Sequence, residues 1–199
     1  GQATITQDLD GKHSITVGKM YSHVGYELAK AADNWNYSRS TLFGYGIPFW
    51  HAGVALKGQY ANGLRWGLYA YDRTDNHRDN NSGKLYGSQL AWVNDKWAAT
   101  YNFITGPEQD RNGGNMRTIQ DLSVQYNHSQ ALSVAIDLLD GKDQNAGGNS
   151  VDQKWNSVAT YLNWKVTEMW RVAVRADWFG ESTKSTATKS GKAASMASP

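Results

Sequence analysis

The sequence lacks cysteine and lacks any apolar run long enough to form a membrane-spanning helix. Without cysteine, neither a disulfide framework nor thiol chemistry is possible. A spanning helix needs about 18 or more mostly apolar residues, whereas this chain has a mean hydropathy of −0.64. Proline is scarce, and Pro48, Pro107 and Pro199 all fall outside the strands predicted below. These features exclude a disulfide-stapled domain and a helical membrane protein.

The sequence also carries little net charge and no enzyme motif of the kinds described below. The formal net charge of +2 is too small to indicate a nucleic-acid partner. The sequence shows no phosphate-binding glycine loop and no nucleophile motif, and the acidic stretches 72–79 and 140–143 lack the order of a calcium loop. We therefore predict no catalytic residue, no metal and no cofactor. The histidines have no metal-ligand spacing; they are His13, His23, His51, His77 and His128.

What the sequence has in quantity is aromatic side chains with a polar tip: nine Trp and eleven Tyr against four Phe. Such side chains suit membrane–water interfaces and sugar-binding surfaces. The 199 residues are enough for one sizeable domain.

The dominant hydrophobic period is two, which indicates strands. In 170–178, for example, apolar and polar or small residues alternate from Trp170 to Trp178. Eight such strands of about 8–11 residues, long enough to cross a bilayer when tilted, are predicted at 51–60, 64–73, 86–93, 97–103, 118–127, 131–138, 156–164 and 170–178. Two further strands are expected at 13–20 and 3–7.

Short and long connections alternate between these strands. The connections at 61–63, 94–95, 128–129 and 166–168 are tight, whereas those at 74–83, 105–115 and 141–153 are long and polar. This sorting is typical of outer-membrane barrels. We predict an all-β fold: an antiparallel up-and-down transmembrane β-barrel, with about 8–10 strands present, over residues 1–180, with a long loop at 21–50. Residues 181–199 are predicted to be a disordered Ser/Thr/Lys/Ala tail.

Tryptophans recur on the apolar side of the alternation, near the predicted strand ends. In a barrel they would form aromatic girdles at the two edges of the lipid band. The alternative is a soluble core containing many indoles. The candidate girdle residues are Trp66, Trp92, Trp97, Trp164, Trp170 and Trp178.

The long connection carries the most distinctive motifs. They are Gly18-Lys19-Met20, Gly25-Tyr26-Glu27, Asn34-Trp35-Asn36-Tyr37-Ser38-Arg39-Ser40, Phe43, Ile47-Pro48-Phe49 and His51-Ala52-Gly53-Val54. Together with the strand pattern, over about residues 14–179, the chain resembles the OmpL-like group of putative β-barrel porins of Gram-negative outer membranes. It departs at Ser22-His23-Val24, where a Thr-Pro-hydrophobic step is expected, at Ala52, where Thr is usual, and at its ends. The resemblance therefore implies a partial barrel, or a natural variant with an unusual tail.

The resemblance implies a passive channel for small polar solutes or ions in the bacterial outer membrane, in contact with lipid. The polar side of the strands would then line the pore, with nearly balanced charges and weak ion selectivity. The pore-lining candidates are Lys57, Arg65, Asp121, Asp137, Arg171, Arg175 and Asp177. The long connection could fold inward and narrow the pore, with Glu27, Lys30, Asp33 and Arg39 near the path. Alternatively, it could cap the outer rim or contribute a short helix around 27–32.

Two other interpretations remain open at this stage. A secreted β-sandwich could use exposed Trp and Tyr for carbohydrate binding or adhesion. A barrel with a plugged lumen could serve as an adhesin or scaffold, since large polar loops suit surface contact. The charged groups inside a small barrel can also simply pair and fill it. The sequence predicts no oligomeric state.

Overall fold

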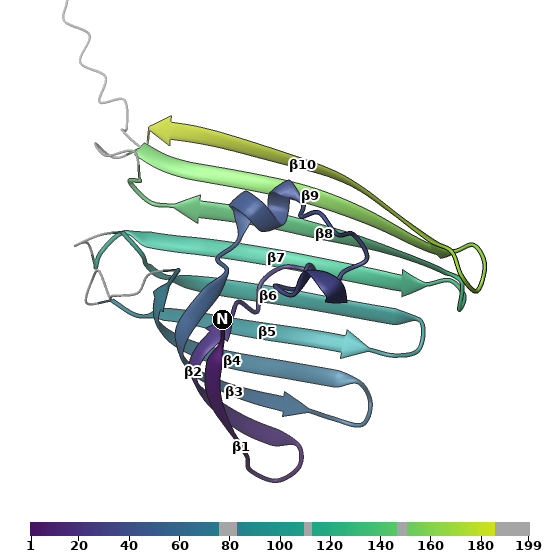
Figure 1. The fold of residues 1–199 in the computed structure, drawn as a ribbon. Helices are drawn as coiled ribbons and strands as arrows, with labels where there is room; N and C mark the ends of the chain where they lie inside the picture. Colours follow the sequence, from purple (N-terminus) through teal and green to yellow (C-terminus); the bar gives the residue numbers. More distant parts are fainter. Residues whose placement is uncertain (76–82, 110–112, 147–150, 186–199) are drawn as a thin grey trace, which may run out of the picture.

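Ten antiparallel strands form one sheet in chain order (Figure 1). The computed structural model describes residues 1–75, 83–109, 113–146 and 151–185. All ten predicted strands are present, and the all-β up-and-down fold is confirmed. The strands are β1 (Ala3–Asp8), β2 (His13–Tyr21), β3 (Trp50–Gln59), β4 (Leu64–Thr74), β5 (Leu85–Val93), β6 (Trp97–Pro107), β7 (Met116–Asn127), β8 (Leu132–Asp143), β9 (Val151–Lys165) and β10 (Arg171–Ser185).

Several strands reach further than the alternation predicts. β8 continues to Asp143 and β9 begins at Val151, so the long connection predicted at 141–153 is wrong at its two ends, which lie in strands. β10 pairs with β9 from Arg171↔Lys165 to Ser185↔Val151, so it passes residue 180, where the sequence places the end of the barrel region. The hydrogen-bonded ladder with β9 holds 181–185 although this stretch has no apolar period. The rest of the predicted tail, 186–199, lies outside the described residues. β6 ends with Pro107, opposite Met116, and a terminal strand position tolerates proline.

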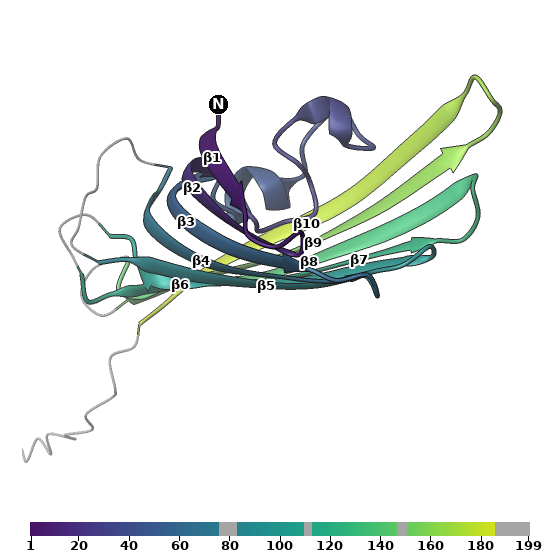
Figure 2. The same ribbon diagram turned by 90° about the horizontal axis from the view of Figure 1, so that it is seen from below.

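The sheet is strongly curved into a trough (Figure 2). The described strands form one layer, not the two packed sheets of a sandwich. The described part of the sheet is open, because β1 and β10 do not pair with each other. One end of the sheet, called here the turn end, carries the tight turns between β3 and β4, β5 and β6, β7 and β8, and β9 and β10. The long connections lie at the opposite end, called here the loop end.

Residues 22–49, called here the inner segment, connect β2 to β3 and lie in the trough (Figures 1 and 2). The segment contains two short helical turns, η1 (Ala31–Asp33) and η2 (Leu42–Gly46). Its two ends are joined, since the Ser22 amide donates to the Phe49 carbonyl at 3.0 Å. No helix within the described ranges combines the length and apolar character required to cross a membrane.

The main hydrophobic core lies between the inner segment and the concave face of the sheet. Val24, Leu42 and Ile47 contribute from the segment. The wall side of the core consists of Met20, Ala55, Tyr69, Tyr71, Leu85, Ile104, Ile119, Ala135, Leu139, Ala159 and Tyr161. The concave face is therefore not uniformly polar, because part of it must pack against a folded segment.

Candidate pore wall and inner segment

The concave face carries polar side chains that are almost completely buried. Asn102, Asp121 and Asp137 are each 1% exposed or less. A hydrogen-bonded row crosses three strands: the Gln89 amide donates to the Asn102 Oδ1 at 2.8 Å, and Asn102 donates to the Asp121 Oδ2 at 2.7 Å. Buried polar groups of this kind require partners, and the row supplies them for the Asn102 side chain and the Asp121 Oδ2. The Oδ1 atoms of Asp121 and Asp137 are buried without a hydrogen-bond partner among the described residues.

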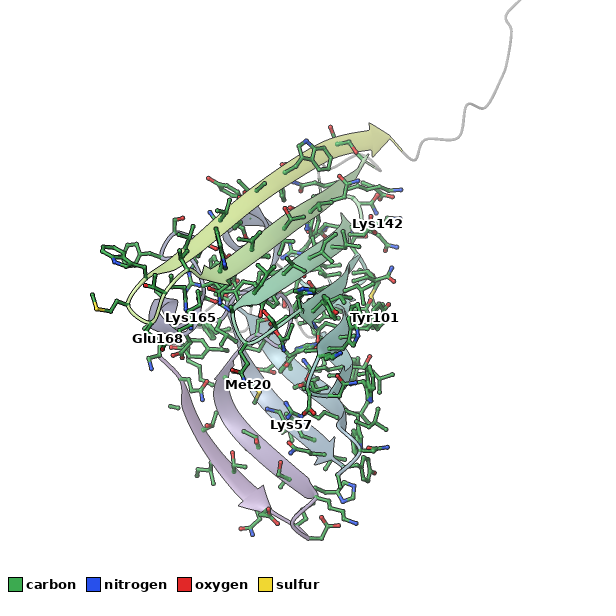
Figure 3. The ribbon with its side chains drawn as sticks, turned by 90° about the vertical axis from the view of Figure 1, so that its right-hand side faces the viewer. Met20, Lys57, Tyr101, Lys142, Lys165 and Glu168 are labelled. Carbon is green, nitrogen blue, oxygen red and sulfur yellow. The ribbon has the colours of Figure 1, made fainter. Side chains whose placement is uncertain are left out.

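The convex face has the opposite character. Met20 and Lys57 point to the concave side, whereas Tyr101 and Lys142 project from the convex side (Figure 3). Large apolar side chains are exposed on every strand of the convex face, which is unusual for a face in contact with water. They include Ile5, Val17, Val54, Leu68, Leu90, Tyr101, Leu122, Val134, Leu138, Trp164, Val172 and Val174. A lipid-facing surface of a barrel has this composition.

Most of the predicted girdle tryptophans gather at the turn end. Trp66, Trp92, Trp97 and Trp164 lie within three residues of a strand end there, and Trp170 precedes β10. Trp178 instead lies midway along β10, because that strand continues to Ser185. At the loop end, other aromatic side chains occupy the strand termini: Tyr21, Trp50 and Tyr86.

The first part of the inner segment is anchored through His23. Its Nδ1 lies 2.9 Å from the Tyr71 hydroxyl and its Nε2 lies 3.3 Å from the Phe103 carbonyl oxygen. The imidazole stacks on Tyr69 at a centroid distance of 4.0 Å. Burial, helped by the positive charge of Lys57, lowers the pKa of His23 to about 4. His23 is therefore a neutral anchor at neutral pH.

Tyr26 fixes the next part of the segment across the trough. Its amide donates to the Asp137 Oδ2 at 3.0 Å, and its hydroxyl donates to the Gln125 Oε1 at 2.9 Å. Burial and the nearby Asp137 raise the pKa of Tyr26, so the phenol remains a donor. Its ring also contacts Tyr161, at a centroid distance of 4.8 Å. These contacts bring residue 26 to β7, β8 and β9.

A charged latch holds the second part of the segment to β10. The Arg175 guanidinium donates to the Glu27 carboxylate at 3.2 Å and to the carbonyls of Ser38 and Arg39 at 2.5 and 2.7 Å. The Asp177 Oδ2 accepts from the amide and the hydroxyl of Thr41 at 2.8 and 2.7 Å. Glu27 is 6% exposed and also accepts from Ser40. This is the densest polar contact between the segment and the wall.

The predicted site residues divide into two groups. Asp121, Asp137, Arg175, Asp177 and Glu27 lie at the interface between wall and segment. The others form their contacts elsewhere: the Lys57 Nζ lies 6.0 Å from the Tyr69 ring centroid, and Arg39 donates to the Ala29 carbonyl on the segment itself. Lys30 and Asp33 pair at 3.5 Å and are largely exposed. Arg65 and Arg171 are exposed near the turn end.

Several anchoring residues were not predicted. Metal-ligand spacing gives no role to His23, and the alternation alone gives none to Tyr69 and Tyr71. The structure brings together no group of three possible metal-binding side chains within its described part. A usable signal was present, since Tyr69 and Tyr71 are large aromatic residues on the polar side of an alternating strand. An aromatic side chain at such a position requires something to pack against.

The comparisons with known proteins agree with this geometry. The model of the family described as "Putative beta-barrel porin-2, OmpL-like" matches residues 2–198. No curated protein and no solved structure matches the chain. The match covers nearly the whole chain, and the all-β sheet, the apolar convex face and the polar concave face all suit a membrane β-barrel. The chain therefore belongs to the OmpL-like family of putative β-barrel porins.

Proposed function

We propose that this protein is a passive channel of the bacterial outer membrane that admits small polar solutes or ions, and that the inner segment narrows its pore. The observation that carries the proposal is the position of residues 22–49 on the polar concave face, anchored by His23, Tyr26 and Arg175. A segment held inside a barrel by several independent contacts would restrict the cross-section of the pore.

A space lined by both polar and apolar side chains remains beside the segment. A cavity of about 550 Å³ lies between the inner segment and the wall of β5–β7. Gln89, Thr100 and Asn102 line it from the wall, and Lys30 and Asp33 line it from the segment. Groups of both charge signs with uncharged hydrogen-bonding side chains favour a hydrated path for polar solutes.

The proposal extends to location and partners. The exposed apolar convex face would contact outer-membrane lipid, and the aromatic residues at the turn end would lie at one interface. The predicted pore-lining set holds four basic and three acidic side chains, Lys57, Arg65, Arg171 and Arg175 against Asp121, Asp137 and Asp177. Such a balance favours weak ion selectivity.

The test is conductance in a planar lipid bilayer, using chain refolded in detergent. A folded barrel is first established by the difference in gel mobility between boiled and unboiled samples. We expect discrete current steps, and a reversal potential near zero in a salt gradient. Heat-modifiable protein that adds no current would contradict the channel and favour a plugged scaffold or adhesin. Protein that folds in plain buffer without detergent would contradict the membrane barrel.

A further inference from the structure

A second cavity, of about 290 Å³, lies on the concave face at the loop end. One side of it is formed by residues 45–48 of the inner segment, and the other by strands from β5 to β10. Among the described lining residues, it shares only Ile47 and Pro48 with the 550 Å³ cavity. The two cavities therefore lie on opposite sides of residues 47–48. A solute that enters from the loop end would meet the second cavity first.

The cavity has an apolar floor and aromatic walls. Leu85, Ile104 and Ile119 form the floor and are 2–3% exposed. The Trp155 indole is fixed in the wall, because its Nε1 donates to the Gly46 carbonyl at 3.0 Å.

The absence of a side chain at Gly141 provides the room that the Trp155 ring needs. A Cβ at residue 141 would lie 2.0 Å from the Trp155 Cε2. The aromatic wall is thus built into the sheet and does not depend on a mobile side chain.

A pair of aromatic rings continues this wall. The ring centroids of Tyr45 and Phe179 lie 5.9 Å apart, with an interplanar angle of 54°. Tyr45 is 76% exposed although it lines the cavity. An aromatic ring held open beside an apolar floor presents a flat surface and a hydroxyl to a ligand.

The rim of the cavity is polar and has unused hydrogen-bonding capacity. Arg117 directs its Nε and Nη2 to the Asp143 Oδ2 at 3.2 and 2.5 Å, which leaves its Nη1 for another acceptor. The Gln153 amide donates to the Glu181 Oε1 at 2.6 Å, which leaves the other carboxylate oxygen for a donor. Asp75 is occupied by the backbone amides of residues 49 and 50.

The charges of the rim argue against an anionic ligand. Among the described residues of the lining, three carboxylates, from Asp75, Asp143 and Glu181, face one guanidinium, from Arg117. An acid or a phosphate would meet net negative charge, whereas a neutral molecule with many hydroxyl groups would find donors and acceptors. The volume lies near the lower limit of small-molecule sites, which begin at about 300 Å³.

We infer that this cavity is a binding site for a neutral sugar of one or two rings, which stacks on Tyr45 and Trp155 and hydrogen bonds to Arg117, Gln153 and Glu181. The inference rests on the proposed function, because it names the class of solute that the channel would select at its loop end. The aromatic walls would contact the faces of the sugar rings, and the rim would contact their hydroxyl groups.

The test is isothermal titration calorimetry on the full chain in a zwitterionic detergent, since maltoside or glucoside detergents would compete for the site. The probes are maltose, glucose and glucuronate. We expect saturable binding of maltose and glucose, and weaker binding of glucuronate. Tyr45→Ala should weaken maltose binding by about tenfold. Tyr37→Ala is the matched control, because Tyr37 lies on the same segment, is 93% exposed and does not line the cavity.

Tyr45→Phe keeps the ring and should retain most of the affinity, and boiled and unboiled gel mobility checks that each variant is folded. Absence of saturable binding, equal effects of Tyr45→Ala and Tyr37→Ala, or a preference for glucuronate over glucose would each overturn the inference. The readout needs no ion flow. Sugar binding without conductance would refute the channel and keep the site, whereas conductance without sugar binding would refute only the site.

Discussion

Removal of the Arg175 side chain is the sharpest perturbation of the inner segment. Arg175 is 12% exposed in its side chain and bonds both to the segment and to Asp177 on its own strand. Without it, the Glu27 carboxylate, whose side chain is 3% exposed, would lose its cationic partner. Breaking a buried ion pair by removing one partner costs about 3–5 kcal/mol, so we expect Arg175→Ala to weaken docking of the segment at least about a hundredfold, at about 1.4 kcal/mol per tenfold.

The assay is single-channel conductance together with limited proteolysis within residues 22–49. Arg175→Ala should increase the mean current, the current noise and the cleavage rate. Arg171→Ala is the matched control, because Arg171 lies on the same strand and face but is exposed near the turn end. Unchanged current and cleavage in Arg175→Ala, or equal changes in both variants, would refute the view that this latch holds the segment in the pore.

Three further predictions concern pH, packing and lipid. His23 has a pKa of about 4 when the segment is docked, against an ordinary value of 6.5, so protonation of His23 favours the undocked segment. Anchoring of the segment should be complete above pH 6.5 and should weaken by up to about 3 kcal/mol as the pH falls toward 4. The bilayer current should therefore rise in acid, and His23→Gln should flatten this response. Gly141→Ala should displace Trp155 and lower the free energy of unfolding by about 1–3 kcal/mol, measured by urea titration, whereas Gly44→Ala, where a Cβ would meet nothing within 4 Å, should not. Leu68→Arg should destabilise the protein in lipid vesicles by about 2–4 kcal/mol if this 55%-exposed side chain faces the bilayer; an unchanged midpoint of unfolding would contradict the lipid-facing assignment.

The sequence was sufficient to predict the strands, because a period of two marks both the strand and its faces. Val172 and Val174 on one face and Arg175 and Asp177 on the other follow directly from this alternation. The end of β10 could not be predicted in this way, since residues 181–185 have no apolar period and are held by backbone pairing with β9. Consequently Trp178, expected near a strand end, lies midway along its strand.

The inward position of the long connection was foreseen only as one possibility among several. Its length and its aromatic residues indicated that it needed something to pack against, but periodicity carries no information on which wall residues it meets. The pairing of Glu27 with Arg175 joins residues 148 positions apart. Similarly, Leu85, Ile104 and Ile119 occupy the concave side as apolar residues because the segment covers them, and a rule that assigns polar residues to the lumen misses them.

We propose that this sheet forms a water-filled path through a membrane, with residues 22–49 inside it. The most direct measurement is the bilayer conductance of refolded, heat-modifiable chain, compared with that of the same chain carrying Arg175→Ala. We expect discrete steps for the unaltered chain and larger, noisier steps for the variant. Heat-modifiable protein with no current from either chain would contradict the channel, and identical steps from both would contradict the placement of the segment in the conducting path.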